Sequence, residues 1–409
     1  MKVEVVEQPV FVPGFRFAGV ACGIKESGNP DLALVLAERP AAAALAFTTN
    51  RVKAGPVLVG LERARRQPLR LQALVVNSGN ANALTGPRGV RDARAMCRIA
   101  ATELGLSEGL VLPCSTGRIG IPLPMERVEA GIRQAAAKLS PHGFHAALRA
   151  IMTTDAFPKF AVRQVTIGAT TVTIAGMAKG AGMIAPRLKL APHATLLAFL
   201  VTDACVDSAG LGQILRQGLP HSFNAAVVDG DTSTNDTVAL LASGVTGERP
   251  LRGRGHGFAR FRDACFEVMQ TLARLVVRDG EGATRVIEIH VQGAATAADA
   301  ARAADAVARS PLCKAAFHGG DPYMGRVVCA LGYSGAKFDP ARLRIWLEDL
   351  EVVRNGRECV AEVEAEANRI AAQPEFRLTI DLRAGRARAF RVCSDLTEEY
   401  VHFNSAYRT

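Results

Sequence analysis

Two hydroxyl-bearing residues stand where a nucleophile or an oxyanion-binding group would be useful. Thr195 follows Ala194 at the head of the apolar run ATLLAFL, directly after a proline-containing loop. Thr116 stands next to Gly117 in the segment PCSTGRIG, and a hydroxyl beside a glycine N–H can stabilise an oxyanion. Both positions also have ordinary interpretations. A threonine before an apolar run is typical of a helix N-cap or a strand, and Ser-Thr-Gly turns are common.

Three further loops carry polar groups that could bind a ligand. The first loop, NSGNANALTG (77–86), follows a predicted strand and precedes a predicted helix, so its backbone N–H groups can face an anion. It lacks the residue spacing of dinucleotide-binding and P-loop motifs. The second loop, VVDGDTSTNDTVAL (227–240), resembles the first half of a calcium-binding loop. A threonine stands where that loop requires glycine, and a leucine stands where it requires the final glutamate. We interpret both as polar turns. Glu281 lies between two glycines of VVRDGEGATR, and its carboxylate is suited to an ammonium group.

The nine cysteines and eight histidines form no recognisable metal or disulfide pattern. No cysteines have C-x-x-C spacing and no histidines have H-x-x-x-H spacing. Most of the cysteines stand among aliphatic residues, as small core residues do. We therefore expect no metal site and no cofactor.

The composition excludes several classes of protein. The 409 residues are 49% hydrophobic and 22% charged, which is typical of a globular α/β-type protein. No apolar stretch reaches about 18 residues, so no membrane span is expected, and the N-terminus lacks the features of a signal peptide. We expect a cytoplasmic protein. The formal net charge is +10, but the basic stretches 61–70 and 251–264 belong to no nucleic-acid module, so we expect a solvated basic face.

The apolar patterning predicts both strands and helices. Short apolar runs predict strands at 32–38, 43–50, 55–61, 71–77, 344–353, 375–385 and 386–397. Residue spacing predicts helices at 91–105, 125–139, 263–279 and 296–312. This mixture indicates layered α/β or α+β sheets and not a purely parallel sheet.

The middle of the chain contains one clear hairpin pattern and one ambiguous segment. The segment 161–178 alternates and turns at Gly168, which predicts a hairpin. The segment 194–204 is too short for its periodicity to decide between strand and helix. The loop from Pro186 to Pro192 is the best candidate for a break in the chain.

A series of segments resembles the ornithine acetyltransferase family, the glutamate N-acetyltransferases of arginine biosynthesis. In chain order the segments are GFRFAGVACGIK, FTTNRVKAGPV, VVNSGNANALTG, STGRIG, TTDAFPK, AKGAGMIAP, ATLLAFLVTDA, DGDTSTNDT, DGEGATR, DPYMGRVVCALGYSG and the closing Asn-x-x-Tyr-x-Thr. Each segment is modest, but their number and order make the resemblance specific and extend it over nearly the whole chain.

The resemblance implies a layered αββα sandwich of the self-processing N-terminal-nucleophile type. It implies that the precursor cuts itself between Ala194 and Thr195, leaving an α chain of residues 1–194 and a β chain of residues 195–409, which would assemble as an α2β2 heterotetramer. Cleavage would free the α-amino group of Thr195. Because an α-amine has an unperturbed pKa of about 7.7–8.0, the nucleophile would then carry its own base.

The resemblance also implies roles for individual residues. Thr195 would take the acetyl group from N2-acetyl-L-ornithine and pass it to L-glutamate, with acetyl-CoA as an alternative acyl donor. Thr116 and the N–H of Gly117 would form the oxyanion hole. The implied substrate contacts are Thr153 (or its neighbour Thr154), Lys179, Thr195, Glu281, Asn404 and Thr409.

The sequence also permits other functions. The chain departs from the family pattern at the insertion RLKLAPH (187–193), at DPYMGR and at the closing NSAY. A paralogue with an altered acyl donor or acceptor, an N-terminal-nucleophile amidase or aminopeptidase that uses water as acceptor, and an uncut non-catalytic protein are the competing hypotheses.

Overall fold

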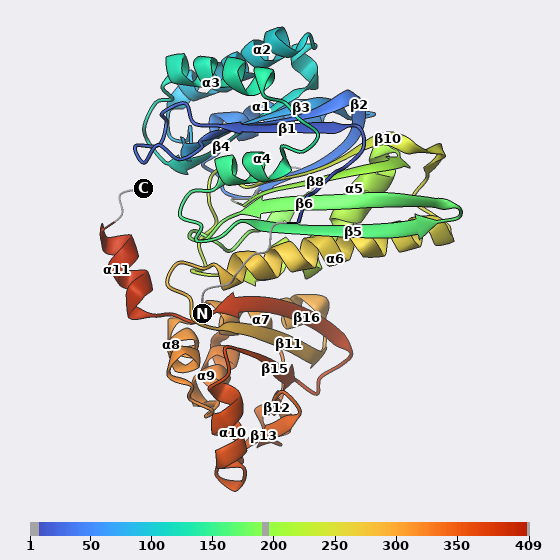
Figure 1. Ribbon diagram of the computed structural model, residues 1–409. Coiled ribbons are helices and arrows are strands. Elements are labelled where there is room, and N and C mark those ends of the chain that lie inside the picture. The colour runs from blue at the N-terminus through green and yellow to red at the C-terminus, as the bar shows by residue number, and fades with distance from the viewer. Residues whose placement is uncertain (1–7, 190–195, 407–409) are drawn as a thin grey trace. The chain divides into compact units, whose positions relative to one another are not determined.

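The computed structural model describes residues 8–189 and 196–406, and these divide into two compact units (Figure 1). Unit 1 comprises the described residues up to Asn224 together with Thr232–Val276, and unit 2 comprises Ala225–Asp231 and the described residues from Val277 onward. The expected break within 186–192 is wrong as a boundary, because the described residues on both sides of it belong to unit 1. The expected pieces 1–194 and 195–409 concern where the chain is cut, and they stay a prediction.

Unit 1 contains a mixed sheet of nine strands among the described residues, in the order β4-β3-β2-β10-β8-β6-β5, with β1 and β7 also paired to β2. The strands are β1 (Phe15–Val20), β2 (Leu32–Thr48), β3 (Arg70–Asn80), β4 (Val111–Arg118), β5 (Lys159–Ile167), β6 (Thr170–Lys179), β7 (Leu188–Lys189), β8 (Leu197–Val206) and β10 (Thr237–Leu251). The helices are α1 (Gly55–Ala64), α2 (Gly86–Leu104), α3 (Met125–Ala137), α4 (Phe144–Ile151), α5 (Ser208–Gly218) and α6 (His256–Arg278).

Strand β3 separates two hydrophobic cores, because successive side chains of a strand point to opposite faces. Ala73 and Val75 belong to an outer core that includes buried residues of α2 and α3. Leu74 and Val76 belong to an inner core that also contains Phe199 of β8. The inner core therefore lies between the two halves of the sheet.

The other half of the sheet is covered by helix α6. At Gly176 of β6 an added Cβ would lie 2.8 Å from side-chain atoms of Val268 and Leu272 on α6, so helix and strand approach closely there. The sequence of layers is thus helices, sheet, sheet, helices, and the predicted αββα arrangement is confirmed for unit 1 (Figure 1).

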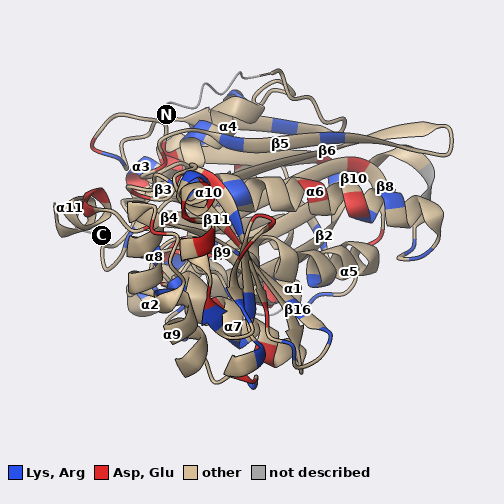
Figure 2. Ribbon diagram, turned by 90° about the horizontal axis from the view of Figure 1, so that it is seen from below, with Lys and Arg blue, Asp and Glu red and all other residues tan. Residues whose placement is uncertain are grey.

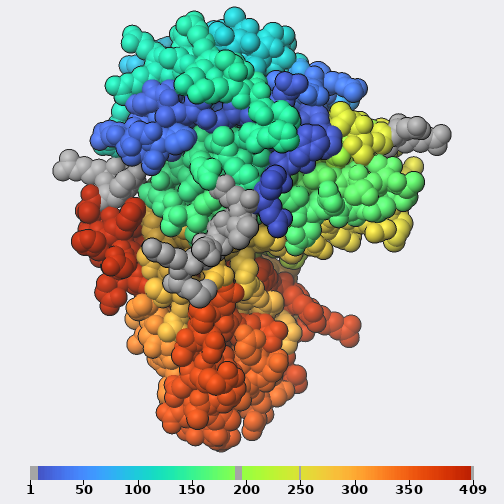
Figure 3. Space-filling view, in the orientation of Figure 1, coloured from blue at the N-terminus to red at the C-terminus, as the bar shows by residue number. Residues whose placement is uncertain are grey.

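Segments far apart in the sequence lie side by side in unit 1. The backbone of Phe17 in β1 exchanges two hydrogen bonds with Ser140, at 2.8 and 3.0 Å. In the space-filling view the first part of the chain is accordingly in contact with the region that carries α4 (Figure 3).

One predicted strand of unit 1 is wrong. Residues 55–61 form the first part of helix α1. Pro56 stands in the first helical turn, where its missing N–H removes no hydrogen bond. At Gly55 an added Cβ would lie 2.3 Å from the carbonyl oxygen of Gly89 in α2, so the glycine lets the two helices pack tightly. An apolar run of seven residues does not distinguish a strand from a buried helix.

The other predictions for unit 1 are confirmed with shifted bounds. The predicted strands 32–38 and 43–50 are one long strand, β2. The predicted hairpin is formed by β5 and β6, with Gly168 at φ +63° in its turn. The ambiguous segment that begins at 194 is a strand, β8, over its described part.

Unit 2 contains a sheet of seven strands among the described residues, in the order β14-β13-β12-β15-β11-β16-β9. The strands are β9 (Ala226–Val227), β11 (Val286–Ala294), β12 (Arg344–Leu347), β13 (Leu350–Arg354), β14 (Arg357–Glu358), β15 (Glu375–Asp381) and β16 (Ala387–Ser394). The helices are α7 (Ala297–Arg309), α8 (Pro311–Gly319), α9 (Gly325–Tyr333), α10 (Glu364–Ala371) and α11 (Glu398–Ala406). One face of the sheet packs on helices in a single apolar core.

Two predictions for unit 2 joined neighbouring elements. The predicted helix 296–312 ends at Arg309, because Ser310 caps α8 and Pro311 begins it. The predicted strand 344–353 is a hairpin of β12 and β13, with Glu348 in its turn at φ +51°. Both boundaries are set by a local feature, a helix cap or a turn, which the spacing of apolar residues does not indicate.

Basic and acidic side chains are interspersed along the elements (Figure 2). In the basic stretch 61–70, Arg63 pairs with Glu108 at 3.3 Å, and Glu62 of the same stretch pairs with Arg94 at 2.8 Å. Arg63 is buried, whereas Arg65, Arg66 and Arg70 are exposed, and these three fit the expected solvated basic face.

The cap of helix α5 makes a first prediction. Asp207 accepts a hydrogen bond from the N–H of Gly210 at 2.7 Å. Asp207→Ala removes this acceptor and should lower the free energy of unfolding by about 0.5–2 kcal/mol, measured by urea denaturation. Asn caps helices as well as Asp, so Asp207→Asn should retain most of the stability. An equal loss in both variants would contradict the capping role.

Candidate active site

The polar residues predicted to do chemistry in unit 1 meet at one end of the inner core. Thr116 on β4 is buried, and it follows Leu112 and Cys114 of the inner core at intervals of two residues. Lys179, at the end of β6, is also buried, and its Nζ donates a hydrogen bond to Oγ1 of Thr116 at 3.2 Å. Because the lysine donates this bond, the hydroxyl proton of Thr116 remains available to an oxyanion.

The strand register places Lys179 next to the start of β8. Lys179 pairs with Leu197 in the antiparallel pairing of β6 and β8, and Leu197 also pairs with Thr237 of β10. The N–H of Thr237 donates to the carbonyl oxygen of Leu196 at 2.6 Å. Leu196, the described residue that directly precedes β8, is therefore held close to the Thr116–Lys179 pair.

Gly117 occupies a position that only glycine can fill. Its φ is +128°, and an added Cβ would lie 2.4 Å from the carbonyl carbon of Gly79 and 2.6 Å from the N of Asn80. Gly79 is its partner in the parallel pairing of β3 and β4. The predicted oxyanion-hole residues thus lie at the edge of a closely packed backbone.

A buried carboxylate organises the loop that carries Thr153. Asp155 accepts hydrogen bonds from the N–H of Thr153 at 2.8 Å and the N–H of Gly180 at 2.7 Å. It also forms an ion pair of 2.6 Å with Lys159, and both side chains are fully buried. Burial opposes the charge, but the cations of Lys159 and Lys179 outweigh it and hold the pKa of Asp155 well below its usual range.

Asn235 joins two loops at the site. Its Nδ2 donates to the carbonyl oxygens of Ala81 and Ser115, so the loop 227–240 fixes the end of β4. The loop 77–86 also bonds internally, since the N–H of Asn82 donates to Oδ1 of Asn80 at 2.8 Å. Both loops use their polar groups to hold backbone, as expected of polar turns.

Two further predicted contacts meet in unit 2. Nδ2 of Asn404 on α11 donates to Oε2 of Glu281 at 3.0 Å. Glu281 precedes Gly282, where an added Cβ would lie 2.5 Å from the N of Tyr400, so this turn packs tightly on α11. Three predicted site residues, Ala194, Thr195 and Thr409, lie outside the described residues.

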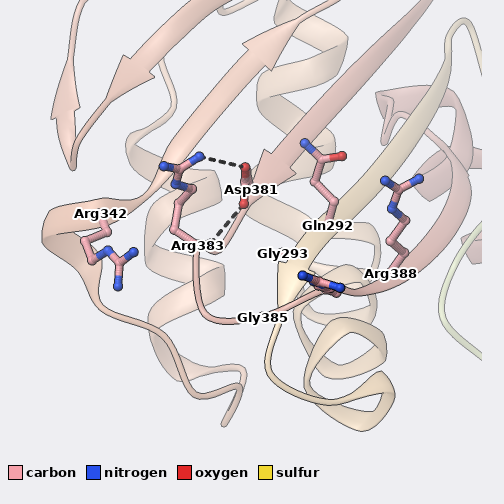
Figure 4. Close-up of a pocket in the computed structure, with 8 residues that line it drawn as sticks. Gln292, Gly293, Arg342, Asp381, Arg383, Gly385 and Arg388 are labelled. Atoms are coloured by element: carbon pink, nitrogen blue, oxygen red, sulfur yellow. Dashed lines mark hydrogen bonds and ion pairs between the residues drawn. The ribbon is translucent and has the colours of Figure 1, made fainter.

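A hollow in unit 2, with a volume of about 480 Å³, is lined by four arginines. In the close-up the side chains of Arg342, Arg383 and Arg388 extend in different directions, and Arg383 is the one paired with Asp381, at 3.8 Å (Figure 4). The hollow is lined by no hydroxyl or thiol nucleophile, so it does not account for acyl transfer.

The described residues contain neither a disulfide nor a cluster of metal ligands. All nine cysteines are free thiols, and six of them are buried. No group of three His, Cys, Asp or Glu side chains within 8–189 and 196–406 could hold a metal ion. In the same part of the chain, every helix is too short or too polar to span a bilayer.

Comparison with known proteins decides the family. The ArgJ family model matches residues 16–409. The arginine biosynthesis bifunctional protein ArgJ of Symbiobacterium thermophilum is 51% identical over 399 residues, which cover 97% of each chain. This chain belongs to the ArgJ family. Its resemblance to the ornithine acetyltransferases is thereby confirmed.

Further relatives match this chain over nearly its whole length or over part of it. The protein of the same name from Geobacter sulfurreducens is 48% identical and covers 97% of this chain and 100% of its own. The solved structure of ornithine acetyltransferase complexed with ornithine, from Mycobacterium tuberculosis, is 42% identical. It covers 44% of this chain and 94% of its own, with a TM-score of 0.39.

Two residues at this ArgJ family site were not predicted from the sequence. They are Asp155 and Asn235, and each stands in a segment that carried the family resemblance. The residue types alone gave no signal, because an aspartate or an asparagine in a polar loop is usually solvated. The burial of their side chains and their hydrogen-bond partners distinguish them.

The buried pair of Asp155 and Lys159 makes a second prediction. Lys159→Met leaves the carboxylate without its closest cation and should lower the free energy of unfolding by about 3–5 kcal/mol, measured by chemical denaturation. The double variant Asp155→Asn with Lys159→Met should recover part of this loss, since it removes the buried charge. No recovery in the double variant would contradict the assignment of the loss to that charge.

The same pair gives the stability of the protein a pH dependence. The folded pKa of Asp155 lies below its unfolded value of about 3.9. Its ionised form therefore stabilises the fold above about pH 4, and this contribution declines as the pH falls below that value. The decline should be smaller in the double variant than in the wild type.

Proposed function

We propose that this chain transfers an acetyl group from N2-acetyl-L-ornithine to L-glutamate by a ping-pong mechanism through an acetylated Thr195. As a member of the ArgJ family the chain is an acetyltransferase of arginine biosynthesis. The observation that carries the proposal is the pairing of Lys179 with Leu197, two residues after Thr195, together with the hydrogen bond from Lys179 to Thr116.

The nucleophile is made by cleavage of the chain. Oγ of Thr195 attacks the carbonyl carbon of Ala194, and the peptide bond becomes an ester. Water then hydrolyses the ester, which leaves a carboxylate on Ala194 and a free α-amino group on Thr195. This amine is partly neutral near pH 7, so it takes the proton of the Thr195 hydroxyl.

Two acyl transfers complete the reaction. In the first, Oγ of Thr195 attacks the acetyl carbonyl of N2-acetyl-L-ornithine, the C–N bond breaks, and the amine leaves with the proton held by the α-amine. In the second, the α-amine of glutamate attacks the acetyl ester, and Oγ of Thr195 leaves and regains a proton. The hydroxyl of Thr116 and the N–H of Gly117 stabilise the oxyanion of each tetrahedral intermediate.

The remaining residues bind the substrates. Lys179 is suited to a carboxylate, and Glu281 to an ammonium such as the δ-amine of ornithine. Asn404 supports Glu281 through their hydrogen bond. Thr153, whose N–H is held by Asp155, and Thr409 are the remaining proposed contacts.

Several features of the assembly belong to the proposal. The cleaved pieces 1–194 and 195–409 form a cytoplasmic α2β2 heterotetramer that needs neither metal nor cofactor. Acetyl-CoA serves as a second acyl donor to glutamate, as the word bifunctional in the relatives' name suggests.

Cleavage and transfer are tested together as a third prediction. Denaturing mass spectrometry of the wild type should show pieces of 194 and 215 residues, the larger beginning at Thr195. Thr195→Ala should give one uncut chain without transferase activity. An unbroken wild-type chain that is active, or an active Thr195→Ala variant, would overturn the mechanism.

The acceptor distinguishes transfer from hydrolysis. With N2-acetyl-L-ornithine alone, a transferase should stop after acetylation of the enzyme, and N-acetylglutamate should appear when glutamate is added. Release of acetate at the same rate with and without glutamate would instead indicate an N-terminal-nucleophile amidase.

The oxyanion hole gives a fourth prediction. Thr116→Val keeps the shape of the side chain and removes its hydroxyl, so kcat should fall by about 10²–10³ while the protein stays cleaved and folded. Thr166→Val removes an exposed hydroxyl from the β5–β6 hairpin and should leave kcat unchanged. A Thr116→Val variant with wild-type kcat would remove Thr116 from the oxyanion hole.

A further inference from the structure

Lys25 lies on a short segment that a buried carboxylate holds in place. Asp31 is fully buried, and its two oxygens accept hydrogen bonds from the backbone N–H groups of Cys22 at 2.7 Å, Ile24 at 2.6 Å and Lys25 at 2.9 Å. Three bonds to one carboxylate leave the backbone of this segment little freedom. The position of Lys25 is therefore set by the fold.

The side chain of Lys25 lies against the proposed oxyanion hole. An added Cβ at Gly79 would lie 3.0 Å from Cγ of Lys25, so the stem of the lysine packs over this glycine. Gly79 is the pairing partner of Gly117, and paired strands lie about 4.8 Å apart. The stem of Lys25 thus packs over the residue that pairs with Gly117 on the neighbouring strand.

The ammonium group of Lys25 makes one hydrogen bond to the described residues. It donates to the carbonyl oxygen of Pro30 at 2.6 Å, and it forms no ion pair with any residue of 8–189 or 196–406. Burial lowers its pKa to about 8, with Asp31 and Asp155 favouring the charge and Lys179 opposing it. An ammonium has three N–H donors and Pro30 accepts from one of them, so the other two are available to a ligand.

Other charged groups near this segment have partners of their own. Glu26 pairs with Arg118 at 3.7 Å, and Arg127 donates to the carbonyl oxygen of Gly23. Among the described residues, Lys25 is thus a cation near the proposed oxyanion hole that no carboxylate pairs at ion-pair distance.

The chemistry of an N-acetyl amino acid indicates what Lys25 would bind. Three bonds separate its α-carboxylate carbon from the acetyl carbonyl carbon, which places the two about 3–4 Å apart. When the carbonyl oxygen occupies the oxyanion hole, the α-carboxylate must lie close beside it. The far end of the substrate side chain lies several bonds further away.

We propose that Lys25 is a substrate-binding residue that contacts the α-carboxylate common to N2-acetyl-L-ornithine and glutamate, so that the site selects amino acids whose α-carboxylate is free. This inference rests on the proposed function. It assigns Lys25 to the end of the substrate shared by donor and acceptor, and it leaves the side-chain end to other residues.

The test compares two substrates that differ at the α-carboxylate alone, N2-acetyl-L-ornithine and its α-carboxamide. Lys25→Met keeps an apolar stem over Gly79 and removes the charge. Its kcat/KM for the carboxylate should fall about ten- to hundredfold, mainly through KM, because a hydrogen bond to a charged group is lost. Its kcat/KM for the carboxamide should change by less than about threefold.

Two variants serve as controls. Lys25→Arg retains the charge and should restore most of the preference for the carboxylate. Lys138→Met removes an exposed lysine from the end of α3 and should leave kcat/KM unchanged for both substrates. An unchanged carboxylate kcat/KM in Lys25→Met, or an equal loss for both substrates, would overturn the proposal.

A pH profile of the wild type tests the proposal without any variant. The ratio of kcat/KM for carboxylate to kcat/KM for carboxamide should fall as the pH rises through about 8, where Lys25 loses its proton. Titration of the Thr195 amine changes kcat/KM for both substrates by the same factor, so it cancels in the ratio. A flat ratio from pH 6 to about pH 10 in an active wild type would refute the role of Lys25. A wild type that transfers no acetyl group would refute the proposed function instead.

Discussion

The candidate site depends on the register between β6 and β8. In this register Lys179 lies opposite Leu197, while Met177 and Phe199, two positions along each strand, lie opposite one another in the inner core. A slip of one residue would turn Lys179 and the apolar side chains of β6 to the opposite face. The same packing that buries the core therefore delivers the lysine to Thr116, on the other half of the sheet.

Polar groups around the site are buried because each has a defined partner. Asp31 holds the segment of Lys25, Asp155 holds the loop of Thr153, and Asn235 holds the end of β4. Burying a polar group is unfavourable unless hydrogen bonds replace those lost from water. These side chains therefore act as rigid supports for backbone, which suits a reaction that needs fixed oxyanion donors.

Much of the fold could be predicted from the sequence, and the failures have physical causes. The β5–β6 hairpin was predictable because alternation and Gly168 agree. The segment 55–61 was assigned to a strand because a short apolar run does not distinguish a strand from a buried helix, and the close packing of Gly55 against α2 is a tertiary contact. The boundaries at Ser310 and Glu348 depend on a cap and a turn, which apolar spacing does not reveal.

The sequence by itself determined the family, the layered fold class and the residues that carry reactive groups, because these depend on residue type and order along the chain. It pointed to Thr116 and Lys179 separately. Only the tertiary structure decided that these two side chains share a hydrogen bond, that Asp155 is a buried anion, and that Lys25 lies over Gly79. Burial, strand register and charge proximity arise between segments distant in the chain, and no local pattern encodes them.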